Sequence, residues 1–313
     1  MGAKGSKLTP KDALLAAAEN GDVKMASKAL KKGAEVDASV MSSGDTALIV
    51  ACKNGQEEIV ELLLESGADA MKTDKRGWTP LFTAVGKGHG GIVRRLVAAG
   101  ADVDAESGNS TPLITAAIHG HTELVAFLLE EGKADVNKRV TGPTLASCAA
   151  CSGVVDVMRM ILDAGAPLQQ DPDASHPDDI PLYHAILHGH LDMVRFLVEE
   201  QGVPLDAVGT RAPLHLAASS AAAEVVQFFV EEHGIDVDSQ DGGETALVAA
   251  TKRACADMDD RMNAMMASQF GHTKEAFMRV IVYLVGQGAA TKDAQFVSRR
   301  LGHPDITALL NAS

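Results

Sequence analysis

Pairs of histidines are the feature of this chain that comes nearest to a metal-binding or catalytic motif. His119-Gly120-His121 and His188-Gly189-His190 each place two imidazoles close together, and His184 lies one helical turn before His188. Gly-His also occurs at His89 and His272, each time at the junction of two expected helices. We therefore interpret these histidines as part of a repeated pattern and expect no metal ligand and no cofactor. A metal-dependent enzyme built on them is the third-ranked function.

The cysteines and the remaining motifs also argue against catalysis. Cys52, Cys148, Cys151 and Cys255 all fall in expected helices, where cysteine packs as a small apolar side chain. Cys148-x-x-Cys151 has no second pair and no alternation of strands and helices around it, so we expect core positions and no disulfides. The sequence has no phosphate-binding glycine loop, no Gly-x-Ser-x-Gly and no nucleophile beside a base. We expect a protein that is not an enzyme.

The elements that position these residues are clearest between Gly77 and Ala105. Thr79-Pro80 predicts a helix start, because threonine caps free backbone N–H groups and the fixed φ of proline suits the first turn. Gly88 ends that helix, and a second helix follows and ends at Gly100. The apolar residues of the second helix share one face: Ile92, Val93, Leu96 and Val97. Two short helices and a hairpin cannot bury these faces alone, so such units must stack.

The same unit recurs along the chain, with 32 to 36 residues between consecutive helix starts. The helix-start leucine stands at Leu14, Leu48, Leu81, Leu113, Leu182, Leu214 and Leu247, and Ala146 replaces it in the fifth unit. The glycine that ends the second helix stands at Gly33, Gly67, Gly100, Gly132, Gly165, Gly202, Gly234 and Gly288. Thr-Pro-Leu, Gly-His and Gly-Ala-x-Val-Asp, in this order, closely resemble the ankyrin repeat from about Leu8 to the end of the chain.

The resemblance implies an all-α fold, an ankyrin-repeat solenoid of stacked helix-turn-helix units with short β-hairpin loops. We expect a flexible tail over 1–8, repeats one to eight over 9–293, and capping helices over 294–313. The eighth repeat carries a helical insertion at about 253–275, in which four methionines share one face: Met258, Met262, Met265 and Met266. This face either packs on the lengthened partner helix or forms a flexible docking surface.

The N-terminal residues match a lipidation motif. Gly2 with Ser6 and Lys7 fits the pattern for N-myristoylation, and an ordinary flexible tail is the alternative. One myristoyl chain binds membranes with a constant of only about 10⁴ M⁻¹, so the tail would be a weak, reversible tether. No apolar run approaches the roughly 20 residues that cross a bilayer, and no secretory signal is present. We expect a cytoplasmic protein, partly membrane-associated if lipidated, with the nucleus also open.

In the ankyrin family the hairpin tips and the exposed ends of the first helices form the binding groove, and here that face is rich in cations. In the second to fifth units we expect the partner-binding residues to be Lys53, Lys72, Lys75, Arg76, Trp78, Lys87, Lys138 and Arg139. The acidic residues are expected on the outer, second helices, although the formal net charge is −14. A locally basic groove would attract an acidic protein segment.

Trp78 is the only tryptophan, and it is either a binding hot spot or packs on its own hairpin. The acidic majority and the lack of an aromatic platform disfavour nucleic acid as a ligand. These features favour a monomeric, non-catalytic scaffold or adaptor that binds other proteins. A stoichiometric inhibitor or regulatory subunit of one enzyme is the alternative.

Overall fold

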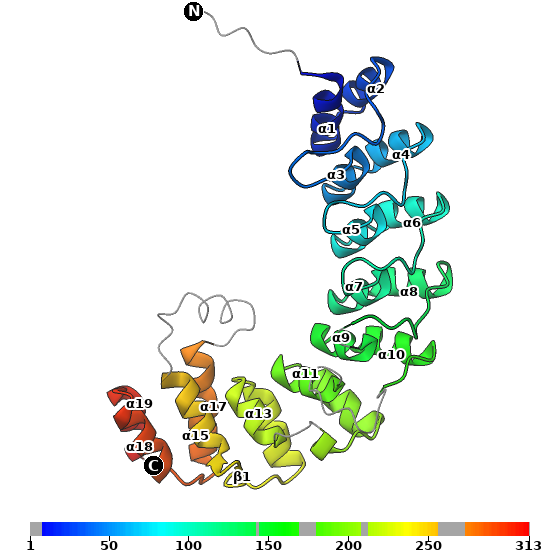
Figure 1. Ribbon diagram of the computed structural model, residues 1–313. Helices are drawn as coiled ribbons and strands as arrows, with labels where there is room; N and C mark the ends of the chain where they lie inside the picture. Colours follow the sequence, from blue (N-terminus) through cyan, green and yellow to red (C-terminus); the bar gives the residue numbers. More distant parts are fainter. Residues whose placement is uncertain (1–7, 142–143, 169–179, 208–211, 256–272, 313) are drawn as a thin grey trace, which may run out of the picture. The chain divides into compact units, whose positions relative to one another are not determined.

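The computed structural model describes residues 8–141, 144–168, 180–207, 212–255 and 273–312, and over these residues the protein consists of consecutive helix pairs (Figure 1). The first helices of the pairs are α1 (Pro10–Asn20), α3 (Ala47–Lys53), α5 (Pro80–Gly86), α7 (Pro112–Ile118), α9 (Leu145–Ser152), α11 (Pro181–Leu187), α13 (Pro213–Ser219), α15 (Ala246–Cys255) and α18 (Lys292–Arg300). Within the described residues no helix is both long and apolar enough to cross a bilayer.

The second helices are α2 (Val23–Lys31), α4 (Glu57–Glu65), α6 (Gly90–Ala98), α8 (Thr122–Glu130), α10 (Val155–Asp163), α12 (Leu191–Arg195), α14 (Ala223–Gln227), α17 (Lys274–Gly286) and α19 (Pro304–Asn311). α12 and α14 continue into the π-helical turns η2 (Phe196–Glu200) and η4 (Phe228–Glu232), and η3 (Leu205–Ala207) is a short 3₁₀ turn. The described strands are β1 (Gln240–Asp241) and β2 (Glu244–Thr245), which pair antiparallel. The predicted all-α fold with short hairpins is confirmed.

Local capping explains where the first helices begin. The hydroxyl of Thr79 accepts a hydrogen bond from the N–H of Phe82 at 3.1 Å, and Thr46 and Thr111 make the same contact three residues ahead. Pro80 and Pro112 occupy the first helical position, where no hydrogen bond from their nitrogen is needed. The threonine and proline signals of the sequence therefore act as predicted.

The chain divides into two compact units, one of residues 1–145 with 156–167 and one of residues 146–155 with 168–313. In the first unit α1, α3, α5 and α7 contact one another in series, and α2, α4 and α6 form a second layer beside them (Figure 1). In the second unit α11, α13, α15 and α18 follow in series, accompanied by α12, α14, α17 and α19. The helix-start leucines are 0–1% exposed and make up the core between the layers: Leu14, Leu48, Leu81, Leu113, Leu182, Leu214 and Leu247.

The end of the fourth repeat differs from the sequence prediction. We expected Gly132 to supply the left-handed residue after α8, but that conformation falls on Lys133, with φ of +58°. The repeat carries one residue more than its neighbours between the buried leucine and this turn. The backbone hydrogen bond that ends the second helix therefore spans six residues here, from the N–H of Ala134 to the carbonyl oxygen of Leu128. In the second repeat the equivalent bond spans five residues, from Ala68 to Leu63. The sixth and seventh repeats also carry the extra residue. Val203 bonds back six residues to Leu197 and Ile235 to Phe229, and the π-helical turns η2 and η4 precede these bonds.

Aspartates connect some of the hairpins to the next one. The carboxylate of Asp37 accepts a hydrogen bond from the N–H of Asp69 at 3.1 Å, and Asp104 accepts one from Asp135 at 3.0 Å. Between the second helices of the third and fourth repeats, Arg94 lies 4.4 Å from the centre of the Phe127 ring and pairs with Glu131. The Val-Asp element and the acidic second helices thus hold consecutive repeats together.

Candidate functional site

One hairpin of the first unit presents an aromatic ring covered by a cation. The guanidinium carbon of Arg76 lies 3.6 Å from the centre of the Trp78 ring, and that ring packs against Phe82 of α5, with 5.4 Å between the ring centres. The carboxylate of Asp74, 5% exposed, fixes this arrangement. It accepts hydrogen bonds from the backbone N–H groups of Arg76 and Trp78 at 2.8 and 2.9 Å, and from Nε of Arg76 at 3.0 Å.

Hydrogen bonding lowers the pKa of Asp74. Burial alone would raise the pKa of this carboxyl, but the hydrogen bonds from Trp78 and Arg76 and the charge of Arg76 outweigh burial and hold the pKa below its usual 3.8. Asp74 is therefore ionised at neutral pH and keeps Arg76 over the tryptophan. Trp78 is half-buried, so it packs on its own hairpin while one side of the Arg76–Trp78 pair reaches the surface.

Two lysines of the same hairpin lie against the preceding hairpin. Nζ of Lys75 donates to the carbonyl oxygen of Met41 at 2.6 Å, and Nζ of Lys72 donates to that of Asp37 at 3.3 Å. Met41 is 85% exposed. Among the described residues neither lysine forms an ion pair with a carboxylate. We call the group Met41, Lys72, Lys75, Arg76 and Trp78 the hairpin surface.

Other predicted partner-binding cations are neutralised by carboxylates on the same face. Lys53 pairs with Asp45 at 2.7 Å and Lys138 pairs with Glu106 at 3.3 Å. Lys53 also lines a depression of about 440 Å³ together with Asp12 and Glu19. The expectation that acidic residues sit elsewhere, on the second helices, is therefore wrong around Lys53 and Lys138.

The sequence carries a signal for the Lys53 pair. An acidic residue stands directly before the capping threonine, and a lysine stands eight residues after the acid, as in Asp45 and Lys53. The same spacing brings Glu244 and Lys252 together in the eighth repeat. Lys87 and Arg139 are exposed and take part in none of the ion pairs among the described residues. The structure thus brings together only part of the predicted set.

Several predicted sites lie outside the described residues. These are the lipidation site Gly2 and the methionine face of the eighth repeat, Met258, Met262, Met265 and Met266. They stay predictions from the sequence.

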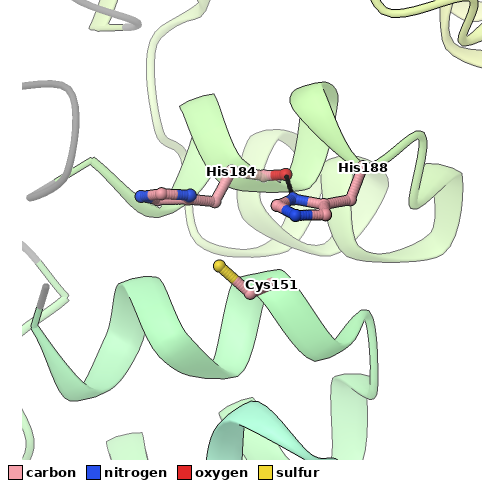
Figure 2. Close-up of side chains that lie close together, drawn as sticks. All are labelled: Cys151, His184 and His188. Carbon is pink, nitrogen blue, oxygen red and sulfur yellow. Dashed lines mark hydrogen bonds between the residues drawn. The ribbon is translucent and has the colours of Figure 1, made fainter. Parts of the chain in front are cut away.

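A second cluster joins the fifth and sixth repeats inside the second unit. Figure 2 shows the thiol of Cys151, on α9, pointing toward the imidazoles of His184 and His188 on α11. One ligand atom from each residue lies within 4.8 Å of the others. His184 is buried, whereas Cys151 and His188 are half-buried. Cys and His side chains at such separations can hold a borderline-soft metal ion.

Hydrogen bonds orient the members of this cluster. Nδ1 of His188 lies 2.8 Å from the carbonyl oxygen of His184, so the ring donates from Nδ1 and keeps the lone pair on Nε2. Burial lowers the pKa of His188, the hydrogen bond to His184 raises it and the charge of His190 lowers it, with a net decrease. Nε2 of His190 contacts the carbonyl oxygen of Cys151 at 3.0 Å.

Sequence reasoning found the two histidines but not their third neighbour. Cys151 stands five residues after the helix-start position of one repeat, and His184 and His188 stand two and six residues after that of the next. Comparing these offsets between adjacent repeats would have placed the three together. The other cysteines are buried thiols: burial raises the pKa of Cys148 to about 12, with a smaller contribution from Cys151, and it also raises the pKa of Cys52 and Cys255.

Family comparison agrees with the stacked helix pairs. The family model described as "Ankyrin repeats (3 copies)" matches residues 3–74, 66–140 and 106–171. The model described as "Ankyrin repeats (many copies)" matches residues 182–230. Together the first three matches cover residues 3–171, more than half of the 313 residues.

Similar proteins have diverse names. The chain is 32% identical over 166 residues to ankyrin repeat and KH domain-containing protein mask-1 of Caenorhabditis elegans, which is 51% of this chain and 6% of the relative. It is 37% identical over 98 residues to the Homo sapiens ankyrin repeat and KH domain-containing protein 1, covering 30% of this chain and 4% of the relative. A C. elegans homolog of transient receptor potential cation channel subfamily A member 1 is 32% identical over 120 residues, which is 38% of this chain and 10% of the relative.

The chain spans at most 10% of the length of these three relatives, and their names do not share one activity. What they share with this chain supports a general role in protein interaction. With its capped helix pairs, its aspartate-linked hairpins and the family matches over residues 3–171, the chain belongs to the ankyrin-repeat family.

Proposed function

We propose that this protein is a non-catalytic scaffold that binds an acidic segment of partner proteins through the hairpin tips of its second to fifth repeats. The hairpin surface is the main contact. Lys87 and Arg139, in the third and fourth repeats, extend it. A general interaction role follows from the family, and the specific face and the acidic partner are the proposal.

The Arg76–Trp78 pair is the observation that carries the proposal. Tryptophan and arginine dominate binding hot spots because they bury a large area and lose little conformational freedom when already held in place. Asp74 holds Arg76 through its backbone and side chain, so the pair is ordered before a partner arrives. A preformed surface loses less entropy on binding than a flexible one.

Charge and exposure around this pair indicate the chemistry of the partner. Lys72 and Lys75 donate to backbone carbonyls, and no carboxylate among the described residues pairs with them and offsets their charge. The exposed thioether of Met41 adds an adaptable apolar contact beside them. An acidic segment that carries an apolar side chain fits both features. The overall charge of −14 would repel such a segment elsewhere on the surface.

The test is a pair of charge reversals that alter net charge equally. Lys72→Glu with Lys75→Glu changes the hairpin surface, and Lys24→Glu with Lys28→Glu changes exposed lysines of α2. Proximity labelling of the wild-type chain first identifies candidate partners, and purified partners are then titrated with both variants. We expect at least a tenfold loss of affinity, and a weaker dependence on salt, for the first variant only.

Equal affinity of the two variants for every direct partner would contradict the proposed face. A set of several partners fits a scaffold. A single partner enzyme, inhibited at a one-to-one ratio, would instead identify the chain as a dedicated inhibitor.

A further inference from the structure

We propose that Cys151, His184 and His188 form a binding site for one zinc ion, or for a chemically similar divalent transition metal, that links the fifth and sixth repeats. The three ligands come from two adjacent first helices, α9 and α11, in the same compact unit. Figure 2 shows the thiol directed from one helix toward the imidazoles of the other.

The donor set selects the kind of ion. One thiolate and two imidazoles are borderline-soft ligands that suit zinc and cobalt, and they lack the oxygen atoms that calcium and magnesium require. Three protein ligands leave the fourth position of a tetrahedral ion for water. Cys151 and His188 are half-buried, which gives the ion a route from solvent, and His184 is buried.

The distances are close to those of a metal site and need only a small adjustment. Around tetrahedral zinc, with bonds of about 2.3 Å to sulfur and about 2.0 Å to nitrogen, neighbouring ligand atoms lie roughly 3.3–3.6 Å apart. The ligand atoms of this cluster lie within 4.8 Å of one another. Rotation of the Cys151 thiol and of the imidazole rings about their side-chain bonds can close a difference of about 1 Å.

Surrounding hydrogen bonds prepare the ligands for an ion. The contact of His188 Nδ1 with the carbonyl oxygen of His184 leaves the lone pair of the ring on Nε2, as in metal-bound histidines whose second nitrogen donates to a carbonyl. His190 contacts the carbonyl oxygen of Cys151 and so holds that residue against the next repeat. These contacts hold the backbone of Cys151 and of His184 in place while the thiol and the imidazole rings rotate toward the ion.

The fourth repeat provides an internal comparison. His119 makes the same contact through Nδ1, with the carbonyl oxygen of Thr115 at 2.8 Å. Thr115 stands where the sixth repeat has His184. Gly86, the equivalent of Cys151, faces it, since a β-carbon there would lie 3.6 Å from Cγ2 of Thr115. The recurring histidine alone is thus a feature of the repeat. Among the residues that the structure describes, only the junction of the fifth and sixth repeats combines it with a thiol and a second imidazole.

The experiment uses the full chain without a polyhistidine tag, because such a tag binds the same ions. After treatment with a chelator, zinc is titrated in competition with a chromophoric chelator, and cobalt is added as a spectroscopic probe. We expect one zinc ion per chain with a Kd near or below about 1 µM. Cobalt should give the near-ultraviolet absorption of a thiolate-to-cobalt charge transfer, together with the visible bands of a tetrahedral ion.

Three variants separate the site from other histidines. Cys151→Ser should abolish the charge-transfer band, and His188→Ala should weaken zinc binding at least tenfold, whereas His119→Ala should leave both unchanged. Circular dichroism checks that each variant is folded. Zinc should also raise the thermal midpoint of the wild type and not that of Cys151→Ser. Absence of the charge-transfer band in the wild type, or equal zinc affinity of the wild type and Cys151→Ser, would overturn the proposal.

Discussion

The imidazole of His190 lies directly against Gly153, the glycine that follows α9 in the preceding repeat. Gly153 has φ of +72°, and a β-carbon built on it would lie 2.5 Å from Cγ of His190. The same relationship joins Gly55 to His89 and Gly88 to His121 in the first unit, at 2.9 and 3.0 Å. The glycine therefore serves two purposes: it adopts a left-handed conformation, and it leaves room for the histidine of the next repeat.

Replacing Gly153 by alanine should lower the free energy of unfolding more than the same change at a glycine that serves only one of these purposes. Gly202 has φ of +68° and no atom within 4 Å of its built β-carbon, so Gly202→Ala should lose about 1 kcal/mol through backbone conformation. Gly153→Ala must also displace His190, and we expect a loss of about 3 kcal/mol. Urea denaturation, monitored by circular dichroism, measures the free energy of unfolding of both variants.

A double variant tests the steric part of this argument. In the background of His190→Ala, the additional cost of Gly153→Ala should fall to about that of Gly202→Ala, because the obstructing ring is gone. Equal costs of the two glycine substitutions in the wild-type background would show that contact with His190 does not matter.

Much of the fold could be predicted because its signals are local. Thr79 and Pro80 predict the start of a helix and Gly88 predicts its end, each within a few residues. The recurrence of these residues along the chain predicts that the helix pairs stack. Contacts between repeats are different, since they depend on which side chains meet across about 33 residues. The pair of Lys138 with Glu106 and the approach of Cys151 to His188 are of this kind, and counting charges or single motifs did not reveal them.

The fourth repeat shows where a local signal misleads. Gly132 matches the period of the terminal glycines, but one extra residue shifts the left-handed turn to Lys133. A β-carbon at Gly132 would lie 2.8 Å from the carbonyl oxygen of Leu128, so this glycine has a steric role instead. The glycine spacing alone does not show which role Gly132 has, because that role depends on the backbone conformation.

Lys133 offers a direct prediction about stability. A lysine at φ of +58° is strained, and Lys133→Gly should raise the free energy of unfolding by up to about 1 kcal/mol, since relief of strain exceeds the flexibility that glycine adds to the unfolded chain. Lys133→Ala is the matched control. It removes the same charge and keeps the strain, so it should change stability little. If both variants are stabilised equally, the gain comes from the charge and not from the backbone.

Asp74 connects the proposed binding surface to pH. Its pKa is lower in the folded protein than its usual 3.8 because hydrogen bonds from Trp78 and Arg76 outweigh burial. A lowered folded pKa stabilises the native state at pH values above the unfolded pKa, and this stabilisation is lost as pH falls through the folded value. At pH 7 we expect Asp74→Asn to lose about 2 kcal/mol, since charged hydrogen bonds to Arg76 disappear.

The difference in free energy of unfolding between the wild type and Asp74→Asn should therefore be constant from pH 7 down to about pH 5 and should shrink below about pH 4. Trp78 is the only tryptophan, so its fluorescence during urea denaturation reports on this hairpin directly. Asp135→Asn, at an exposed position on a later hairpin, serves as the control and should have a smaller effect at pH 7. A gap between the wild type and Asp74→Asn that stays the same at pH 3 would mean that the ionised carboxylate does not stabilise the hairpin, and Arg76 would then be held over Trp78 by packing alone.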